Sequence, residues 1–174
     1  MNAAHHRQRG VSLVEALAVM AIAALLAAAA APAYTNLVQE NRLSTQANAV
    51  LAALRYARNE AVTRGGHVTL CAESGGACLG TSDWAQGWMA FADADGDGFL
   101  DPGEALLRRW PAVHASHSLH KGKKVRVRFD AQGFAAGYHD TFRLCDARGP
   151  AYGRGIIVSN QGRTRVAHGV SACP

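Results

Sequence analysis

Three patterns of hydrophobic and polar positions follow one another along the chain. Residues 16–31 carry no charged or strongly polar side chain, and the apolar stretch 11–33 that contains them is long enough to cross a bilayer as a helix. Over 34–64 apolar residues return every three or four positions, which predicts an amphipathic helix. Over 67–174 short runs of β-branched and aromatic residues alternate with Gly and Asp, which predicts strands joined by turns.

The apolar positions of the second pattern define the face of the helix that packs. Its members are Leu43, Ala47, Val50, Leu54, Ala57 and Ala61. The pair Gly65-Gly66 is typical of a helix C-terminus. We therefore expect one helix from Val11 to Arg64, kinked or locally broken at Pro32, with its second half lying against a sheet.

The third pattern predicts an antiparallel sheet. Its strand-like segments are 67–71, 87–91, 105–110, 125–129, 141–145 and 156–159. One amphipathic helix followed by several strands is an α+β arrangement in which the helix covers one face of the sheet. The roughly 140 residues after the membrane segment suffice for one compact core and are too few for two ordinary domains.

A single acid, Glu15, interrupts the apolar stretch close to its start, just after a short basic leader that ends at Gly10. A charge in such a segment is expensive in lipid and suggests a dedicated partner. A secretory signal peptide has its cleavage site after the apolar run, whereas the candidate site here precedes that run. An ordinary signal anchor explains the hydrophobicity and the basic flank but gives no reason for the acid.

The hexapeptide Gly-Val-Ser-Leu-Val-Glu at 10–15, with Pro32 further along, resembles the type III signal of type IV pilins and pseudopilins. The resemblance implies that a prepilin peptidase cuts between Gly10 and Val11 and methylates the new N-terminus. It also implies that Glu15 pairs with the N-terminal amine of a neighbouring subunit during filament assembly. Val11 stands where the family usually has Phe. The chain then divides into a leader peptide (1–10), a transmembrane and assembly segment (11–33) and an exported head (34–174).

All four cysteines lie in the expected head, at Cys71, Cys78, Cys145 and Cys173. An even number in an exported domain indicates two disulfides, with three possible pairings. Cys71 and Cys78 bracket a short turn and can close a local loop, which would leave Cys145 to Cys173. A zinc site would need CxxC-type spacing, and the sequence has none.

One acidic segment has the spacing of an EF-hand calcium loop, with oxygen ligands at its first, third, fifth and twelfth positions and glycine at the sixth. The four acids are Asp93, Asp95, Asp97 and Glu104. EF-hand loops lie between two helices, whereas the flanks here read as strands. Asp and Gly are also the residues that a turn between strands needs. We therefore interpret the segment as a structural turn, with calcium binding as the alternative, and expect no cofactor.

The charge is distributed unevenly between the two halves of the chain. Residues 11–104 hold four Lys or Arg and ten Asp or Glu, whereas residues 105–174 hold twelve and three. Within the basic half, Lys124, Arg126 and Arg128 alternate with apolar residues and so project from one face of the strand predicted over 125–129. Cations about 7 Å apart, two strand residues per step, approximate the spacing of phosphates along a nucleic-acid strand.

A second basic element lies close to the C-terminus, in the segment Gly162-Arg163-Thr164-Arg165. On an extended backbone the side chains of Arg163 and Arg165 project to the same side. The planar guanidinium group is well suited to bidentate phosphate contacts. A tail held by a disulfide would present both groups at a small ordering cost.

This C-terminal segment, together with the Gly-Trp-x-x-Phe-x-Asp run at 87–93, resembles the FimT/GspH branch of minor pilins and pseudopilins, and the Gly-Arg-x-Arg tail matches the FimT type. The resemblance implies a minor type IV pilin that assembles with other pilins and captures double-stranded DNA, without sequence preference, for uptake in natural transformation. Arg163 and Arg165 would contact the DNA, assisted by Arg154 and Arg148. The protein would begin as a single-pass inner-membrane protein with a periplasmic head and end on a pilus at the cell surface.

The alternative is a purely structural role, as a GspH-like minor pseudopilin of a type II secretion system or as a pilus-initiating subunit. The arginines would then serve solubility or subunit contacts, and the signal and the helix are common to both hypotheses. An enzyme is not expected, because the histidines show no triad or metal-ligand spacing and no Ser or Cys nucleophile motif is present.

Overall fold

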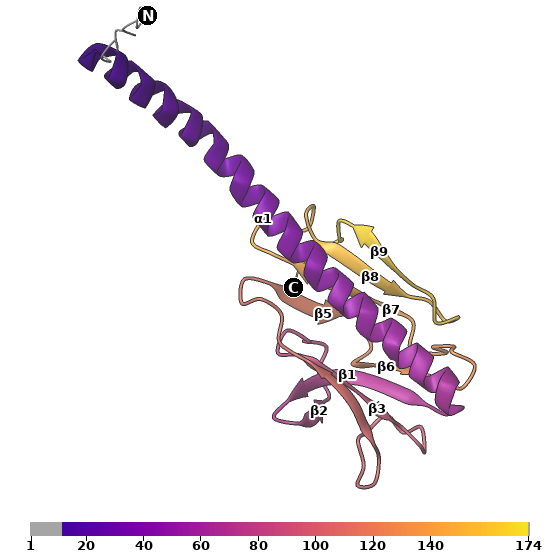
Figure 1. The fold of residues 1–174 in the computed structure, drawn as a ribbon. Coiled ribbons are helices and arrows are strands. Elements are labelled where there is room, and N and C mark those ends of the chain that lie inside the picture. Colours follow the sequence, from indigo (N-terminus) through magenta and orange to yellow (C-terminus); the bar gives the residue numbers. More distant parts are fainter. Residues whose placement is uncertain (1–11, 174) are drawn as a thin grey trace, which may run out of the picture. The chain divides into compact units, whose positions relative to one another are not determined.

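The computed structural model describes residues 12–173, which form one long helix and nine strands (Figure 1). The chain divides into two compact units, residues 1–39 and residues 40–174. The helix α1, Leu13–Arg64, contributes its first half to the first unit and its second half to the second unit. The second unit also contains every strand and is called the head below.

The described part of the first unit is the apolar half of α1, whose side chains are exposed almost throughout. The amide of Glu15 donates to the hydroxyl of Ser12 at 3.2 Å, a contact typical of a helix N-terminus. The helix is not interrupted at Pro32, where we expected a kink or a break; the hydroxyl of Thr35 donates to the Pro32 carbonyl at 2.9 Å. This half of α1 is long and apolar enough to cross a membrane.

The second half of α1 packs in the head through the stripe that the periodicity predicted. All six positions of the stripe are buried, and Ala53 joins them. The helix ends at Arg64 because Gly65 adopts a left-handed conformation, with a φ of 64°, and the amide of Gly66 donates back to the carbonyl of Ala61 at 3.2 Å.

The strands form two antiparallel sheets, and not the single sheet that we expected. The first sheet has the order β2-β1-β3-β4, with β6 also paired to β1; its strands are β1 (Val68–Ser74), β2 (Ala77–Leu79), β3 (Trp88–Ala92), β4 (Leu106–Trp110) and β6 (Arg126–Phe129). The second has the order β5-β7-β8-β9; its strands are β5 (Ser118–Lys121), β7 (Asp140–Cys145), β8 (Arg154–Val158) and β9 (Thr164–His168). The chain changes sheet three times, between β4 and β5, between β5 and β6 and between β6 and β7, because β5 pairs with β7 whereas β6 pairs with β1.

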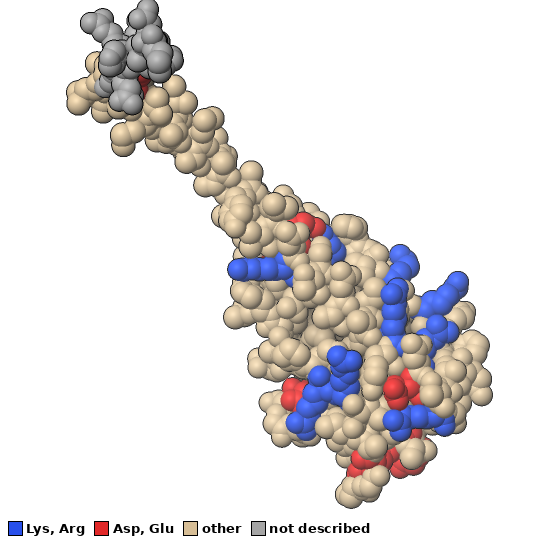
Figure 2. All heavy atoms as spheres, viewed as in Figure 1, with Lys and Arg blue, Asp and Glu red and all other residues tan. Residues whose placement is uncertain are grey.

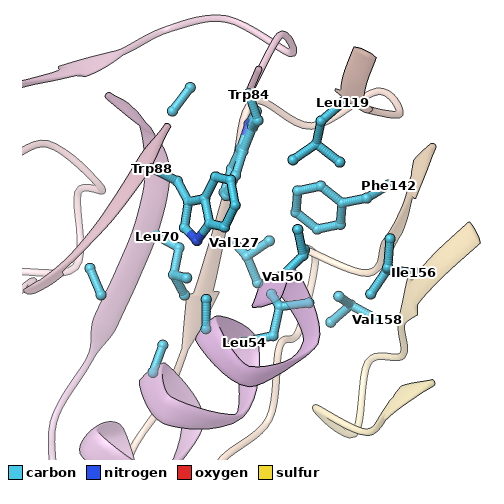
Figure 3. Close-up of a cluster of buried hydrophobic side chains, with 14 of the residues drawn as sticks. Val50, Leu54, Leu70, Trp84, Trp88, Leu119, Val127, Phe142, Ile156 and Val158 are labelled. Carbon is cyan, nitrogen blue, oxygen red and sulfur yellow. The ribbon is translucent and has the colours of Figure 1, made fainter. Parts of the chain in front are cut away.

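The core of the head joins the helical stripe to one face of each sheet (Figure 3). Val50 and Leu54 of α1 lie near Val127 of the first sheet and near Ile156 and Val158 of the second. An edge-to-face pair of aromatic rings, Trp84 and Phe142, has its centroids 4.8 Å apart. The core therefore fixes both sheets against the same helix.

Two disulfides cross-link the head. Cys71 of β1 is bonded to Cys78 of β2, with a Cα separation of 5.7 Å, and Cys145 of β7 is bonded to Cys173, with a Cα separation of 5.9 Å. This is the pairing that the local spacing of the first two cysteines favoured. The second bond fastens the segment after β9 to a central strand of the second sheet.

Candidate nucleic-acid interface

The turn between β8 and β9 holds Arg163 at the start of the edge strand. Two backbone hydrogen bonds close the turn. The amide of Gly162 donates to the Ser159 carbonyl, and the amide of Ser159 donates to the Arg163 carbonyl, each at 2.9 Å. Gly162 has a φ of 71°, and a Cβ there would lie 1.9 Å from the Gly133 carbonyl oxygen. Only glycine allows this approach. The turn is therefore held against the loop that follows β6.

Arg163 and Arg165 are both exposed and both line one hollow of about 390 Å³. Arg165 lies opposite Ile157 in the β8–β9 ladder, on the face of the second sheet that is turned away from the buried Ile156 and Val158. Within residues 12–173 neither arginine has an ion-pair partner. The two guanidinium groups therefore share one surface with no competing carboxylate.

Two helical arginines lie on the other side of Arg163, which also borders a second hollow of about 420 Å³ with Arg55 and Arg58. The guanidinium of Arg58 donates to the Gly133 carbonyl at 2.9 Å, which ties it to the same loop. Figure 2 shows basic side chains gathered along the part of the head where β8 and β9 lie, and acidic ones at its lower end. The sequence analysis did not assign these helical arginines to the interface.

Arg154 and Arg148, the two expected assistants, are engaged inside the head. Arg154 is 4% exposed; its guanidinium bonds to the Glu40 carboxylate and donates to the Tyr152 carbonyl at 2.7 Å. Burial lowers the pKa of Arg154, which nevertheless stays a cation. Arg148 forms a two-pronged contact with Asp146, at 2.9 and 2.7 Å, and lies 3.6 Å from Glu40. Neither side chain is available for a phosphate.

The three cations predicted along the strand at 125–129 also differ in how exposed they are. Lys124 is exposed, as predicted, but Arg126 and Arg128 are half-buried against neighbouring loops. Arg126 donates to the Gly98 carbonyl and stacks on the Phe99 ring at 4.2 Å, and Arg128 lies 5.0 Å from the centre of the Tyr138 ring. Of the predicted row of three cations, Lys124 is therefore exposed, whereas Arg126 and Arg128 are partly covered.

The acidic segment that we interpreted as a turn joins the strands β3 and β4. An EF-hand loop would instead join two helices. The carboxylate oxygens of Asp93, Asp95 and Asp97 lie within 4.8 Å of one another. Asp93 is fully buried and accepts from the Thr69 hydroxyl at 2.6 Å and the Gly98 amide at 3.2 Å. Glu104 accepts from the amides of Ala94 and Asp101 at 2.6 and 3.1 Å. These carboxylates accept hydrogen bonds from backbone amides, as is typical of Asp and Glu in a structural turn.

Sequence reasoning missed a third basic group, on the outer face of the second sheet. Lys123, Lys124, His139 and Arg143 line a hollow of about 730 Å³. These residues come together only because of how the strands pair, which the sequence does not show directly. The one local signal was that Thr141 and Arg143 alternate with the buried Phe142 and Leu144, so that Arg143 projects from the outer face.

Asp140 at the rim of this hollow is already paired. Its carboxylate accepts from the ammonium of Lys121 at 3.1 Å and from the amides of Lys124 and Thr141 at 2.9 and 2.8 Å. Burial by itself would raise the pKa of Asp140, but these amides and the ammonium outweigh it and hold that pKa below its ordinary value. The group stays ionised and its charge is offset by Lys121.

Of the residues assigned to processing and assembly, Glu15 lies in the first turn of α1. Gly10 and Val11 lie outside the described residues.

Comparison with known proteins adds three findings. The family model of type II transport protein GspH matches residues 46–162, and that of the prokaryotic N-terminal methylation motif matches residues 5–31. Two crystal structures of the type IV minor pilin FimU of Pseudomonas aeruginosa share the fold. One is 23% identical with a TM-score of 0.60, covering 76% of this chain and 100% of FimU; the other is 24% identical with a TM-score of 0.62, covering 79% and 99%. No curated protein matches the sequence.

Proposed function

Because the chain belongs to the family of type II transport protein GspH, we propose that it is a minor type IV pilin whose head captures double-stranded DNA for uptake. Arg163 and Arg165 would make the principal contacts. The support for DNA binding comes from the surface of the head.

The chain is a structural subunit of the pilin and pseudopilin class; it is not an enzyme and has no cofactor requirement. Such subunits assemble with other pilins, and the N-terminal methylation motif implies processing by a prepilin peptidase. An inner-membrane anchor through the apolar half of α1 fits this class. The periplasmic position of the head and its later display on a pilus belong to the proposal.

The observation that supports DNA binding is the pair of exposed arginines, with Arg163 in the turn between β8 and β9 and Arg165 in β9. Arg163 and Arg165 border one hollow, and no acid of the described residues pairs with them. Cations that neutralise phosphates release counterions from the duplex, a driving force that is independent of sequence and falls steeply with salt. Capture without base readout suits a fibre that must bind any DNA and later release it.

The test compares R163Q/R165Q with a charge-matched control, R108Q/R109Q, in which two exposed arginines of β4 in the other sheet are neutralised. Binding of the full chain in detergent to a short duplex is measured at several salt concentrations. Two lost phosphate contacts should reduce the slope of log affinity against log salt by roughly 2 in the first variant, and the control should leave it unchanged.

An unchanged slope in R163Q/R165Q would reject the assignment of the tail. If the unaltered protein binds no duplex at low salt, the structural role in secretion or pilus initiation takes precedence, and the match to type II transport protein GspH favours that role.

A further inference from the structure

The outer face of the second sheet carries a hollow with a small-residue floor and a basic rim. Phe142 and Ile156 point into the core, so their neighbours Arg143 and Gly155 face the opposite way. Arg143, Gly155 and Ala167 lie side by side in register across β7, β8 and β9. Gly155 has no side chain and Ala167 only a methyl group, so a hollow of about 730 Å³ remains over this part of the sheet, with Val170 of the C-terminal segment beside Gly155.

This hollow adjoins the one beside the tail arginines. Ile157 borders both, and the register places Arg165, Ile157 and Thr141 in a row across β9, β8 and β7. Strands in a sheet lie about 4.8 Å apart, so the β7 and β9 positions of that row are roughly 10 Å apart. The 390 Å³ hollow and the 730 Å³ hollow therefore meet at Ile157, between Arg165 of β9 and Thr141 of β7.

The rim is positively charged and lacks partners within the head. Lys123 and Lys124 are exposed and pair with no acid among residues 12–173. The Nε of Arg143 is buried and has no hydrogen-bond partner in the same range. The one acid at the rim, Asp140, is offset by Lys121. Among residues 12–173 the rim therefore offers a bound anion cations that no acid already pairs.

We propose that this hollow is a second backbone-binding site for the same duplex, with Lys124 and Arg143 contacting phosphates across β8 from Arg165. The inference rests on the proposed function of the tail. The strands β9 and β7, which carry Arg165 and Arg143, lie about 10 Å apart, a spacing between the widths of the two grooves of B-form DNA, about 6 Å for the minor groove and about 12 Å for the major groove. A head that holds both rows contacts duplex from two sides of one groove.

Two variants test the second site in different ways. K124Q/R143Q removes charge but keeps the Lys124 amide that holds Asp140. G155V narrows the hollow without changing charge; its Cβ would meet side-chain carbons of Thr141, Val170 and Ala167 at 3.6–3.9 Å, which are ordinary contacts for the Cβ itself. Thermal unfolding of the full chain in detergent checks that both variants are folded.

Binding to a short duplex is then measured at several salt concentrations beside R163Q/R165Q and R108Q/R109Q. We expect K124Q/R143Q to reduce the salt slope by roughly 2, in addition to the effect of R163Q/R165Q. G155V should weaken binding severalfold, and R108Q/R109Q should change nothing.

The two proposals fail in distinguishable ways. If R163Q/R165Q loses affinity while folded K124Q/R143Q and G155V bind like the unaltered protein, the second site is rejected and the tail assignment stands. If the K124Q/R143Q and G155V variants lose affinity but R163Q/R165Q does not, DNA binds at the outer face and the role of the tail is wrong. If the unaltered protein binds no duplex, both proposals are rejected.

Discussion

The carboxylate of Glu40 in α1 bonds to the guanidinium of Arg154 in β8, two residues that are 114 positions apart in the sequence. The same carboxylate lies 3.6 Å from Arg148. Glu40 thus connects the helix to the second sheet through two arginines that the sequence had suggested for DNA. Glu40, together with Asp146 in the case of Arg148, keeps both arginines from the binding surface.

Replacing Glu40 by Gln should destabilise the head. The change leaves Arg154, 4% exposed, with backbone acceptors but without a countercharge. Because Glu40 itself is 38% exposed, we expect a loss of about 1–2 kcal/mol, less than for a fully buried pair. Urea unfolding of the full chain in detergent measures the difference. E60Q, which breaks the exposed Glu60–Arg64 pair on the same helix, is the control and should cost under about 0.5 kcal/mol.

Acid should destabilise the protein through Asp146. Burial by itself would raise the pKa of this carboxyl, but the two-pronged contact with Arg148 outweighs it and holds the pKa below its ordinary value. A lowered folded-state pKa stabilises the fold above the unfolded-state value of about 3.9, and this contribution disappears as the pH falls below it.

Unfolding midpoints measured between pH 6 and pH 2 should therefore show a steeper loss below about pH 4 in the unaltered protein than in D146N. D146N should be less stable near neutral pH and should approach the unaltered protein at the acid end. Parallel pH profiles for the two proteins would contradict the assignment of this loss to Asp146.

Opening the Cys145–Cys173 disulfide should cost more than opening Cys71–Cys78. The two bonds close loops with sequence separations of 28 and 7 residues. In the chain-entropy model these loops correspond to about 3.5 and about 2.5 kcal/mol of stability. Urea unfolding of C145S/C173S and C71S/C78S should preserve this order. Equal losses would mean that the longer loop is already restricted in the unfolded chain.

Removing the Asp93 carboxylate should loosen the turn between β3 and β4. D93A leaves the Thr69 hydroxyl and the Gly98 amide without their acceptor in a buried place, at a cost of about 2 kcal/mol. D95A, which removes an exposed acceptor of the same turn, should cost much less. Calcium at millimolar concentration should not shift the midpoint of the unaltered protein. A calcium-dependent rise that D95A abolishes would show that the segment is a metal site.

The elements that the sequence predicted well are those whose signal is local. The stripe on α1 follows from the helical period, and six of the nine strands in the described residues were found to within a few positions. The three that were missed, β2, β5 and β9, are short or mix polar with apolar residues, so alternation alone could not reveal them. The division into two sheets depends on strand pairing, which the pattern does not encode.

The candidate site shows the same limit. Arg163 and Arg165 could be proposed from the sequence because positions i and i+2 of an extended segment project to the same side whatever lies elsewhere. Arg126 was misjudged because its acceptor, Gly98, lies 28 residues away, and Arg143 was missed because the hollow beside it is created by Gly155 and Ala167 on other strands. Charge is visible in a sequence, but whether a charge is free is decided by tertiary contacts.

The covalent bond between Cys145 and Cys173 bears on how the head withstands force. β9 is an edge strand, and an edge strand with a loose end detaches one backbone hydrogen bond at a time when it is pulled. Here the chain on one side of β9 returns through a tight turn to β8, and on the other side it is stapled to β7. If a bound polymer pulled on Arg165, the force would act on all the backbone hydrogen bonds between β8 and β9 together. The strand would then resist the force as a unit and would not detach bond by bond.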